Sequence, residues 1–302
     1  MSKLWLNGSL LDADVARISP SDLGLLHAAG AFTTLRARRG EAWQLDRHLR
    51  RLRDTCTALS IPLSYTDDDL RSAIADVLHA NSLASARLRL TVTRGTTRDD
   101  PERGLIVEPT VLLTAQELQP YPRELYERGM TVLLLDDWKL NPFDPHAGHK
   151  TLNYFPRLSA MQRAREHGAQ EAIWFNTYNQ AQSGSLSNLL LVRDGAIVTP
   201  PAQAELDADA ALRERTKCPR SNVLPGTTRA ALLDLARDLR IVDRIEPVDI
   251  NALLEAQEVL LCNSIMLLMP VVRIERHEVG TGKPGPIFQK LSEALRAEAD
   301  SR

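Results

Sequence analysis

One lysine stands in a setting that could carry covalent chemistry. Lys150 lies in the segment HKTLNY, residues 149–154, just after a loop marked by Pro142 and Pro145. Further along, the segment PGTTR at 225–229 runs directly into a stretch with the apolar spacing of a helix. A lysine amine forms Schiff bases with aldehydes, and a helix N-terminus offers free N–H groups and hydroxyls to a phosphate. Together these features indicate an enzyme that uses pyridoxal phosphate.

The alternative for this lysine is a solvated position in a loop, where most lysines lie. The chain offers few other amines, because its lysines are Lys3, Lys139, Lys150, Lys217, Lys283 and Lys290. We therefore interpret Lys150 as the candidate cofactor lysine.

The first third of the chain mixes short strands with helices. Its opening residues indicate a strand that ends in an Asn7–Gly8 turn. Alternation and helical spacing predict strands at 31–38, 87–93 and 107–114, and helices at 48–59 and 67–79. In the rest of the chain, predicted strands alternate with predicted helices. The strands are expected at 131–135, 172–176, 189–192 and 259–261, and the helices at 152–167, 227–239 and 287–299.

Two prolines mark the expected domain boundary. Pro120 and Pro122 cannot both sit inside a helix, so the segment around them indicates a linker. We expect a small N-terminal α/β domain over residues 1–117, a linker over 118–123, and a larger C-terminal α/β domain over 124–302 that carries Lys150. The expected fold class is α+β or mixed α/β.

Composition argues against several other classes of protein. The net charge of −2 gives no reason to expect binding to nucleic acid or to an anionic membrane. The three cysteines are widely spaced, and His146 and His149 lack a third ligand, so we expect neither a disulfide framework nor a metal site. The opening residues lack the apolar core of a signal peptide, and the apolar runs are too short to span a bilayer. We expect a cytoplasmic protein.

The motifs of the chain, taken in order, resemble those of the fold-type IV pyridoxal phosphate enzymes. That group includes branched-chain aminotransferases, D-amino acid aminotransferases and 4-amino-4-deoxychorismate lyases. The matching motifs are LNG at 6–8, SPSDLGLLH at 19–27, GAFTTLR at 30–36, HLRRL at 48–52, Lys150 with NY at 153–154, SNL at 187–189, GTTR at 226–229, CNS at 262–264 and GKPGP at 282–286. The resemblance covers nearly the whole chain and implies the two-domain fold of D-amino acid aminotransferases.

The resemblance also implies a role for the matching residues. Lys150 would hold the cofactor as a Schiff base and then move a proton at the substrate carbon. Arg51 matches the arginine that binds the cofactor phosphate, with a basic helix face as the alternative. Thr227 and Thr228 would donate backbone N–H and hydroxyl groups to the phosphate, although an ordinary helix N-cap has the same geometry.

Three more residues belong to the implied cofactor site. Ser264 would bind the phosphate, and Tyr154 would lie near the ring oxygen or the phosphate. Both could instead be core residues. Asn188 belongs to the matching segment SNL and is expected among the cofactor-binding residues.

Ser183 departs from the family pattern. The family has a glutamate five residues before the asparagine that Asn188 matches, and this carboxylate holds a proton on the pyridine nitrogen. A serine hydroxyl gives only a neutral hydrogen bond, so the ring nitrogen would stay unprotonated and transamination should suffer most. Pyridoxal enzymes with a serine there tend to catalyse eliminations. Gln182 is the alternative ring partner if the match is shifted by one residue.

The motif around Thr33 favours a lyase in the same way. Aminotransferases of the group usually have Phe-Glu-Thr at this point, whereas this chain has Phe32-Thr33-Thr34, the form seen in aminodeoxychorismate lyases. Thr33 would relay a proton or hold substrate, unless it is simply a β-branched strand residue. The lyase substrate carries two carboxylates, for which Arg89 and Arg103 are candidate partners. Either could instead be a surface arginine.

The sequence thus predicts a pyridoxal phosphate-dependent lyase that converts 4-amino-4-deoxychorismate to 4-aminobenzoate and pyruvate in folate synthesis. An aminotransferase of branched-chain or D-amino acids is the first alternative. A cofactor-binding paralogue with little turnover, because of Ser183, is the second. Members of the group place the active site at a domain and subunit boundary, so we also expect a homodimer acting on a small molecule.

Overall fold

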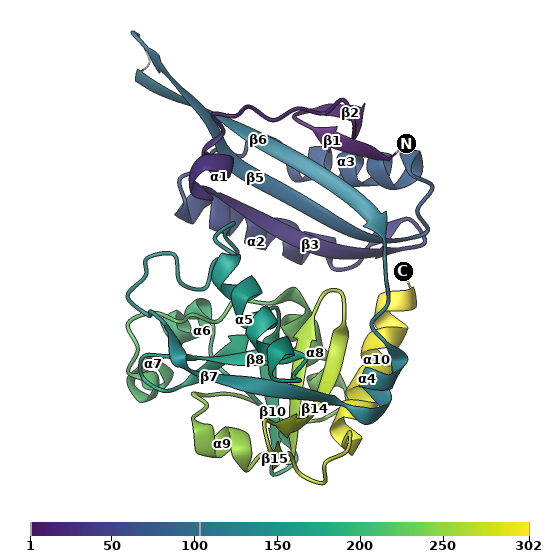
Figure 1. The fold of residues 1–302 in the computed structure, drawn as a ribbon, viewed down its shortest axis with the longest axis vertical. Coiled ribbons are helices and arrows are strands. Elements are labelled where there is room, and N and C mark those ends of the chain that lie inside the picture. Colours follow the sequence, from purple (N-terminus) through teal and green to yellow (C-terminus); the bar gives the residue numbers. More distant parts are fainter. Residues whose placement is uncertain (1, 103, 302) are drawn as a thin grey trace. The chain divides into compact units, whose positions relative to one another are not determined.

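The computed structural model describes residues 2–102 and 104–301, which group into two compact units. The first unit comprises the residues up to 119 together with 149–153, and the second comprises 120–148 together with 154–301. Both units contain helices and strands (Figure 1). This confirms the expected mixed α/β fold class.

An antiparallel sheet forms the first unit, with strand order β2-β1-β6-β5-β3-β4. Its strands are β1 (Lys3–Leu6), β2 (Ser9–Asp12), β3 (Gly30–Arg38), β4 (Glu41–Ala42), β5 (Ser85–Asp100) and β6 (Gly104–Glu117). Asn7 and Gly8, with φ of 47° and 92°, turn the chain from β1 to β2, and this positive φ suits an Asn-Gly pair. β5 and β6 continue beyond the sheet as a long hairpin (Figure 1).

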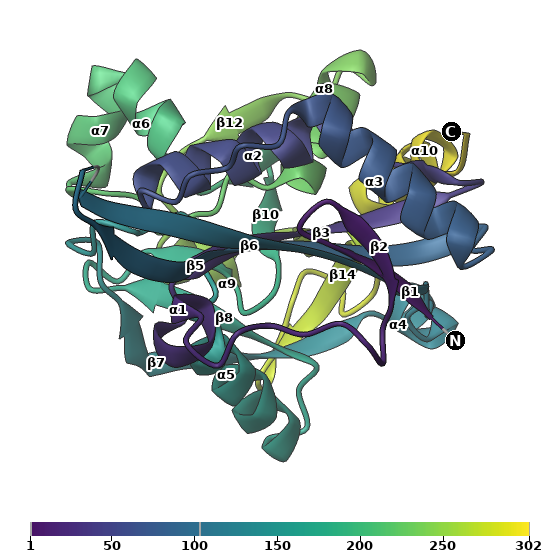
Figure 2. The same cartoon turned by 90° about the horizontal axis from the view of Figure 1, so that it is seen from above.

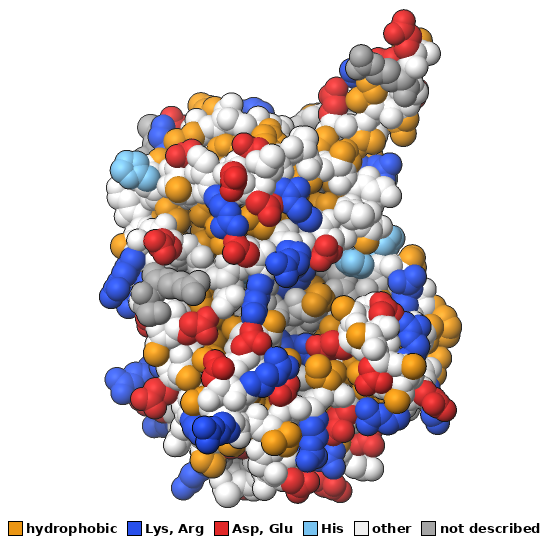
Figure 3. Space-filling view, turned by 180° about the vertical axis from the view of Figure 1, so that it is seen from behind, with side chains coloured by type: hydrophobic (Ala, Val, Ile, Leu, Met, Phe, Trp, Pro, Cys, Tyr) orange, Lys and Arg blue, Asp and Glu red, His pale blue; other side chains and the backbone are white. Residues whose placement is uncertain are grey.

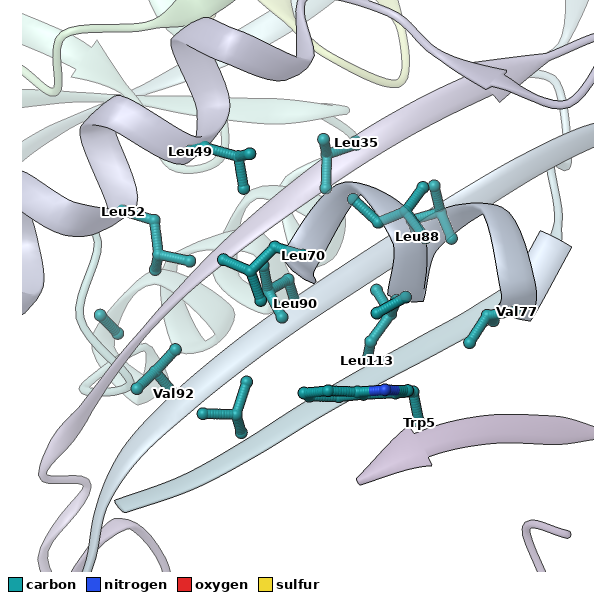
Figure 4. Close-up of a cluster of buried hydrophobic side chains, with 14 of the residues drawn as sticks. Trp5, Leu35, Leu49, Leu52, Leu70, Val77, Leu88, Leu90, Val92 and Leu113 are labelled. Atoms are coloured by element: carbon teal, nitrogen blue, oxygen red, sulfur yellow. The ribbon is translucent and has the colours of Figure 1, made fainter. Parts of the chain in front are cut away.

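Two helices, α2 (Leu45–Ala58) and α3 (Asp67–Ala80), cover one face of this sheet (Figure 2). The short α1 (Leu23–His27) packs against β5. Thr66 and Asp69 form a capping box that starts α3. Alternation along the strands turns every second side chain toward these helices. The resulting core contains Trp5, Leu35, Leu49, Leu52, Leu70, Val77, Leu88, Leu90, Val92 and Leu113 (Figure 4).

The segment around Lys150 pairs with the start of β3. Phe32 N donates to Lys150 O (3.1 Å), and Leu152 N donates to Gly30 O (2.9 Å). A side chain on Gly30 would meet Leu152 at 2.6 Å and a strand carbonyl at 2.7 Å, so only glycine fits there. Because of this pairing, residues 149–153 group with the first unit, whereas the sequence alone assigns them to the C-terminal domain. For the same reason the helix expected from residue 152 begins at Phe155.

The second unit is built on a closed sheet. Its strands are β7 (Met130–Leu140), β8 (Glu171–Asn176), β9 (Ala181–Gly184), β10 (Asn188–Arg193), β11 (Ala196–Thr199), β12 (Asp243–Ile245), β13 (Glu258–Asn263), β14 (Leu267–Ile274) and β15 (His277–Glu278). The strand order is β12-β11-β10-β13-β14-β7-β8-β9, with β15 beside β14. β9 also pairs with β10 through Ser183 and Asn188, which closes β10, β13, β14, β7, β8 and β9 into a barrel.

Apolar side chains from alternate strand positions form the core of this barrel, among them Ile173, Phe175, Leu189, Leu191, Val259 and Leu261. Helices pack around it: α4 (Arg123–Arg128), α5 (Phe155–Glu166), α6 (Gln203–Ala208), α7 (Ala210–Thr216), α8 (Thr227–Asp238), α9 (Ile250–Leu254) and α10 (Pro286–Ser301). α5 lies on β7 and β8, whereas α8 and α10 lie against β13.

Several strands run beyond their predicted bounds. β5, β6 and β7 extend past the predicted ranges 87–93, 107–114 and 131–135. β5 and β6 pair with each other along the added length, and β7 pairs with β8 again at Lys139 and Leu140 after a shift in register. In the described residues, no helix is both long and apolar enough to cross a membrane. Acidic and basic side chains are interspersed over the face shown in Figure 3.

The last helix begins at a buried carboxylate. Glu258 on β13 accepts hydrogen bonds from Ile287 N and Phe288 N, both at 2.8 Å. A side chain on Gly285 would collide with this carboxylate at 2.3 Å, so the glycine leaves it room. Glu258 therefore caps α10 and attaches it to the barrel.

We predict that Glu258→Ala lowers the free energy of unfolding by about 2–4 kcal/mol, because two amide groups lose a buried charged acceptor. Urea unfolding followed by circular dichroism measures the change. Glu293→Ala, an exposed position on the same helix, should leave the midpoint unchanged. Equal effects of the two substitutions would contradict the capping role of Glu258.

Candidate active site

The ring of Phe32 holds two cations on one face of the first unit's sheet. The Lys150 Nζ atom lies 4.7 Å from the ring centroid, and the Arg89 Cζ atom lies 3.7 Å from it. Arg89 also donates from Nε to Thr91 Oγ1 (3.2 Å). Cation–π attraction of this kind favours both positions. The fold thus brings Arg89, a predicted substrate partner, beside the same ring as the candidate cofactor lysine.

Thr33 lies on the opposite side of β3, facing α2. Its Oγ1 atom is 2.7 Å from His48 Nδ1 and accepts a hydrogen bond from Arg51 Nη2 (3.1 Å). Thr33 and His48 are fully buried, and Arg51 is 8% exposed. Because alternate residues of a strand point to opposite faces, Thr33 points away from the face that Phe32 shares with Lys150. In this structure the Thr33 hydroxyl therefore positions Arg51.

His48 is held in its neutral form. Burial lowers its pKa well below the usual value, and the charges of Arg51 and Lys150 lower it further. A neutral imidazole can accept the Thr33 proton at Nδ1, which leaves the hydroxyl oxygen free to accept from Arg51. The guanidinium of Arg51 is thereby oriented by a neutral network.

The start of α8 forms an anion-binding arrangement in the second unit. Thr227 and Thr228 are buried in its first turn, and Thr227 Oγ1 lies 3.5 Å from Ser264 Oγ. The Thr228 Oγ1 atom is buried and has no hydrogen-bond partner. Free N–H groups and a hydroxyl at a helix N-terminus suit a phosphate. A phosphate oxygen would satisfy this buried hydroxyl, so the residues present fit a phosphate group.

Asn188 shapes the turn that precedes α8. Its Nδ2 atom donates to Leu224 O (2.9 Å), and a side chain on Gly226 would meet its Oδ1 atom at 1.9 Å. In this structure Asn188 therefore holds the turn in place, and Gly226 is required for the close approach.

Ser183 is the residue that pairs with Asn188 across the barrel seam. Gln182, the alternative ring partner, binds backbone instead: its Oε1 atom accepts from Asn222 N (3.3 Å), and its Nε2 atom donates to Gln180 O (3.3 Å). Gln182 is thus engaged with backbone groups, and the match of Ser183 to the family glutamate stays a prediction.

A buried glutamate supports the turn after Ser183. Glu171 accepts hydrogen bonds from Ser185 N (2.8 Å), Leu186 N (3.3 Å) and the Ser187 hydroxyl (3.2 Å). Burial raises its pKa, and these hydrogen bonds oppose the rise. Sequence reasoning missed Glu171, because its partners become neighbours only when β8 and β9 pair.

Two more arginines were missed. Arg157 of α5 donates to Gly184 O (3.1 Å) and Ser185 O (3.0 Å) in the same turn. Arg94 is half-buried beside the β5 bulge, and its backbone N–H donates to Ala29 O (2.8 Å). The Arg94-Gly95 pair, with a glycine φ of 63°, was the signal that could have marked this bulge.

The remaining predicted residues are placed as follows. Tyr154 is half-buried at the N-cap of α5. Arg103 lies outside the described residues. The part of the chain that the structure describes contains no cluster of His, Cys, Asp or Glu suited to a metal.

Comparison with known proteins identifies the family. The family described as Amino-transferase class IV matches residues 30–274. The chain belongs to this family. It is therefore a class IV enzyme whose cofactor is pyridoxal phosphate, a group with both aminotransferase and lyase members.

The similar proteins include both aminotransferases and a lyase. A putative branched-chain-amino-acid aminotransferase of Methanocaldococcus jannaschii is 27% identical, over 97% of this chain and 95% of the relative. The structure of the branched-chain amino acid aminotransferase of Escherichia coli superposes with a TM-score of 0.87 at 25% identity, over 99% and 95% of the two chains. The structure of 4-amino-4-deoxychorismate lyase from Pseudomonas aeruginosa superposes with a TM-score of 0.80 at 29% identity, over 98% of this chain and 99% of that chain.

We predict that Thr228→Val weakens cofactor binding about 10- to 100-fold, the value of one hydrogen bond to a charged group. The apo-protein should be no less stable, because its unsatisfied buried hydroxyl disappears. Cofactor titration and thermal unfolding measure the two quantities. Thr216→Val is the matched control, since its buried hydroxyl is bonded to Leu212 O: it should lose stability and keep affinity. The reverse pattern would rule out the phosphate role of Thr228.

We predict that His48 makes stability depend on acidity. Its folded-state pKa is lowered, so the unfolded chain binds a proton first as the pH falls below about 6.5, and stability is lost in that range. His48→Asn should flatten this slope, which amounts to at most about 1.4 kcal/mol per pH unit. Urea unfolding at several pH values measures it. The exposed control His27→Gln should keep the wild-type slope; an unchanged slope in His48→Asn would show that His48 is not its source.

Proposed function

We propose that the protein is a pyridoxal phosphate-dependent lyase that converts 4-amino-4-deoxychorismate to 4-aminobenzoate and pyruvate. The observation that carries the proposal is Ser183, which occupies the β9 position paired with Asn188. A hydroxyl there supports elimination better than transamination. Transamination needs a protonated ring to store the charge of a carbanion, whereas elimination passes that charge to the leaving group.

The residues around Lys150 would perform the proton transfers. When bound, pyridoxal phosphate would supply an electron-withdrawing group to the carbon that carries the substrate amine. Lys150 would take the proton from this carbon, and the bond between the substrate ring and the enolpyruvyl oxygen would break. The ring becomes aromatic as 4-aminobenzoate, and the leaving group takes up a proton to become pyruvate.

The other site residues would bind and orient. Arg51, positioned by Thr33, and the hydroxyls of Thr227, Thr228 and Ser264 would hold the phosphate. Tyr154 would contact the cofactor near its ring oxygen or phosphate, and Asn188 would act by shaping the turn before α8.

Cations are available for the substrate carboxylates. Arg89 lies against the same aromatic ring as Lys150, and Arg94 is half-buried on the same strand. We propose Arg89 as the first carboxylate partner; the earlier candidate Arg103 stays a prediction.

An aminotransferase of branched-chain or D-amino acids is the second candidate. The aminotransferase relatives favour it, whereas Ser183 and Thr33 do not. A homodimer is proposed in either case, and the exposed Phe155 and Leu158 on α5 are consistent with an apolar contact surface. A paralogue with little turnover would bind the cofactor but transform neither kind of substrate.

We predict that the purified protein with pyridoxal phosphate shows a visible absorption band that Lys150→Ala abolishes. Enzymatically generated aminodeoxychorismate should yield equimolar pyruvate and 4-aminobenzoate, and Lys150→Ala should lower this rate at least about 1,000-fold. Lys283→Ala, an exposed lysine, is the matched control and should retain band and rate.

Other outcomes separate the alternatives. Conversion of the cofactor to its pyridoxamine form by D-alanine or L-leucine, without pyruvate from aminodeoxychorismate, would establish an aminotransferase. A band that no amine changes would indicate the paralogue. Lack of any band would overturn the assignment of Lys150.

A further inference from the structure

Arg157 clamps the segment that presents Ser183. It lies in the first turn of α5, and its Nη1 atom donates to Gly184 O (3.1 Å) and Ser185 O (3.0 Å). The same Nη1 atom lies 3.5 Å from Ser183 Oγ. All three partners belong to the end of β9 and the turn that follows it. The guanidinium is thus fixed by carbonyls immediately beside the serine hydroxyl.

The strand register explains why Ser183 faces this arginine. Ser183 pairs with Trp174 on β8 and with Asn188 on β10, and directly paired residues point to the same face of a sheet. Trp174 packs against Ala160 and Ala164 of α5. Ser183 therefore lies on the outer face of the barrel, on the side of α5.

The charge of Arg157 is not neutralised by a carboxylate. In the part of the chain that the structure describes, its hydrogen bonds go to two carbonyls and one hydroxyl. Glu171, the buried acid of the same turn, uses its oxygens for backbone N–H groups and the Ser187 hydroxyl. A positive charge therefore lies beside Ser183, the residue that the resemblance matches to a family glutamate.

We propose that Arg157 acts through Ser183 to keep the ring nitrogen of bound pyridoxal phosphate unprotonated. This inference rests on the cofactor site proposed above. A serine oxygen that accepts from Arg157 directs its own proton outward, toward an acceptor. Such a chain of hydrogen bonds stabilises a neutral pyridine nitrogen, and the fixed guanidinium charge disfavours a pyridinium. Arg157 is thus a positioning residue, and it favours elimination over transamination, which passes through a carbanion.

The test is nitrogen NMR of the holoenzyme with pyridoxal phosphate labelled with ¹⁵N in the ring. Its chemical shift, followed over the pH range in which the protein stays folded, reports ring protonation independently of turnover. The wild type should remain unprotonated at neutral pH. Arg157→Gln and Arg157→Met, which remove the charge in two ways, should each raise the ring-nitrogen pKa by about 1 or more.

Two controls separate charge from packing. Arg157→Lys keeps the charge and should retain the wild-type ring signal. Arg165→Gln removes an exposed arginine from the same helix and should also leave it unchanged. Ser183→Glu combined with Arg157→Gln should protonate the ring more fully than Ser183→Glu alone, since Arg157 would otherwise pair with the new carboxylate.

Each outcome decides one question. This inference would be overturned if the ring nitrogen were protonated in the wild type. It would also be overturned if Arg157→Gln and Arg157→Met kept the wild-type ring signal. Neither result would bear on cofactor binding. Absence of bound cofactor in the wild type would overturn the proposed function with it. A ring signal that depends on Arg157 supports the inference, whichever substrate the enzyme turns over.

Discussion

The site depends on the pairing of the lysine segment with β3. Two backbone hydrogen bonds join Lys150 and Leu152 to Phe32 and Gly30, and they place the lysine amine over the Phe32 ring. The pairing is possible only because Gly30 has no side chain where Leu152 approaches. A lysine on a flexible loop would lose entropy on binding a ligand, whereas the sheet positions Lys150 in advance.

In each unit a buried titratable side chain supports neighbouring residues of the candidate site. His48 is kept neutral by burial and by nearby cations, so Thr33 and His48 orient Arg51 without neutralising it. The oxygens of Glu171 accept hydrogen bonds from the turn that this residue supports.

The class IV scaffold fixes where the cofactor binds, and a few positions set the reaction that it supports. The barrel closes at the Ser183–Asn188 pair, so the backbone of Ser183, the residue proposed to face the cofactor ring, is held by the seam of the sheet. Exchange of a glutamate for a serine there would leave this backbone pairing unaltered. Its chemical effect is large, because it replaces a charge by a dipole next to an electron-accepting ring.

Local patterns in the sequence determined much of this protein. The Asn7–Gly8 turn, the amphipathic helices α2 and α3, and the start of α8 all follow from interactions within a few residues. Motif order was sufficient to indicate the family and its cofactor. Tertiary structure decided which unit holds Lys150, that Thr33 faces Arg51, and that Arg157 and Glu171 meet around Ser183. These contacts join residues far apart in the chain, and strand register and helix packing set them, so no local pattern encodes them.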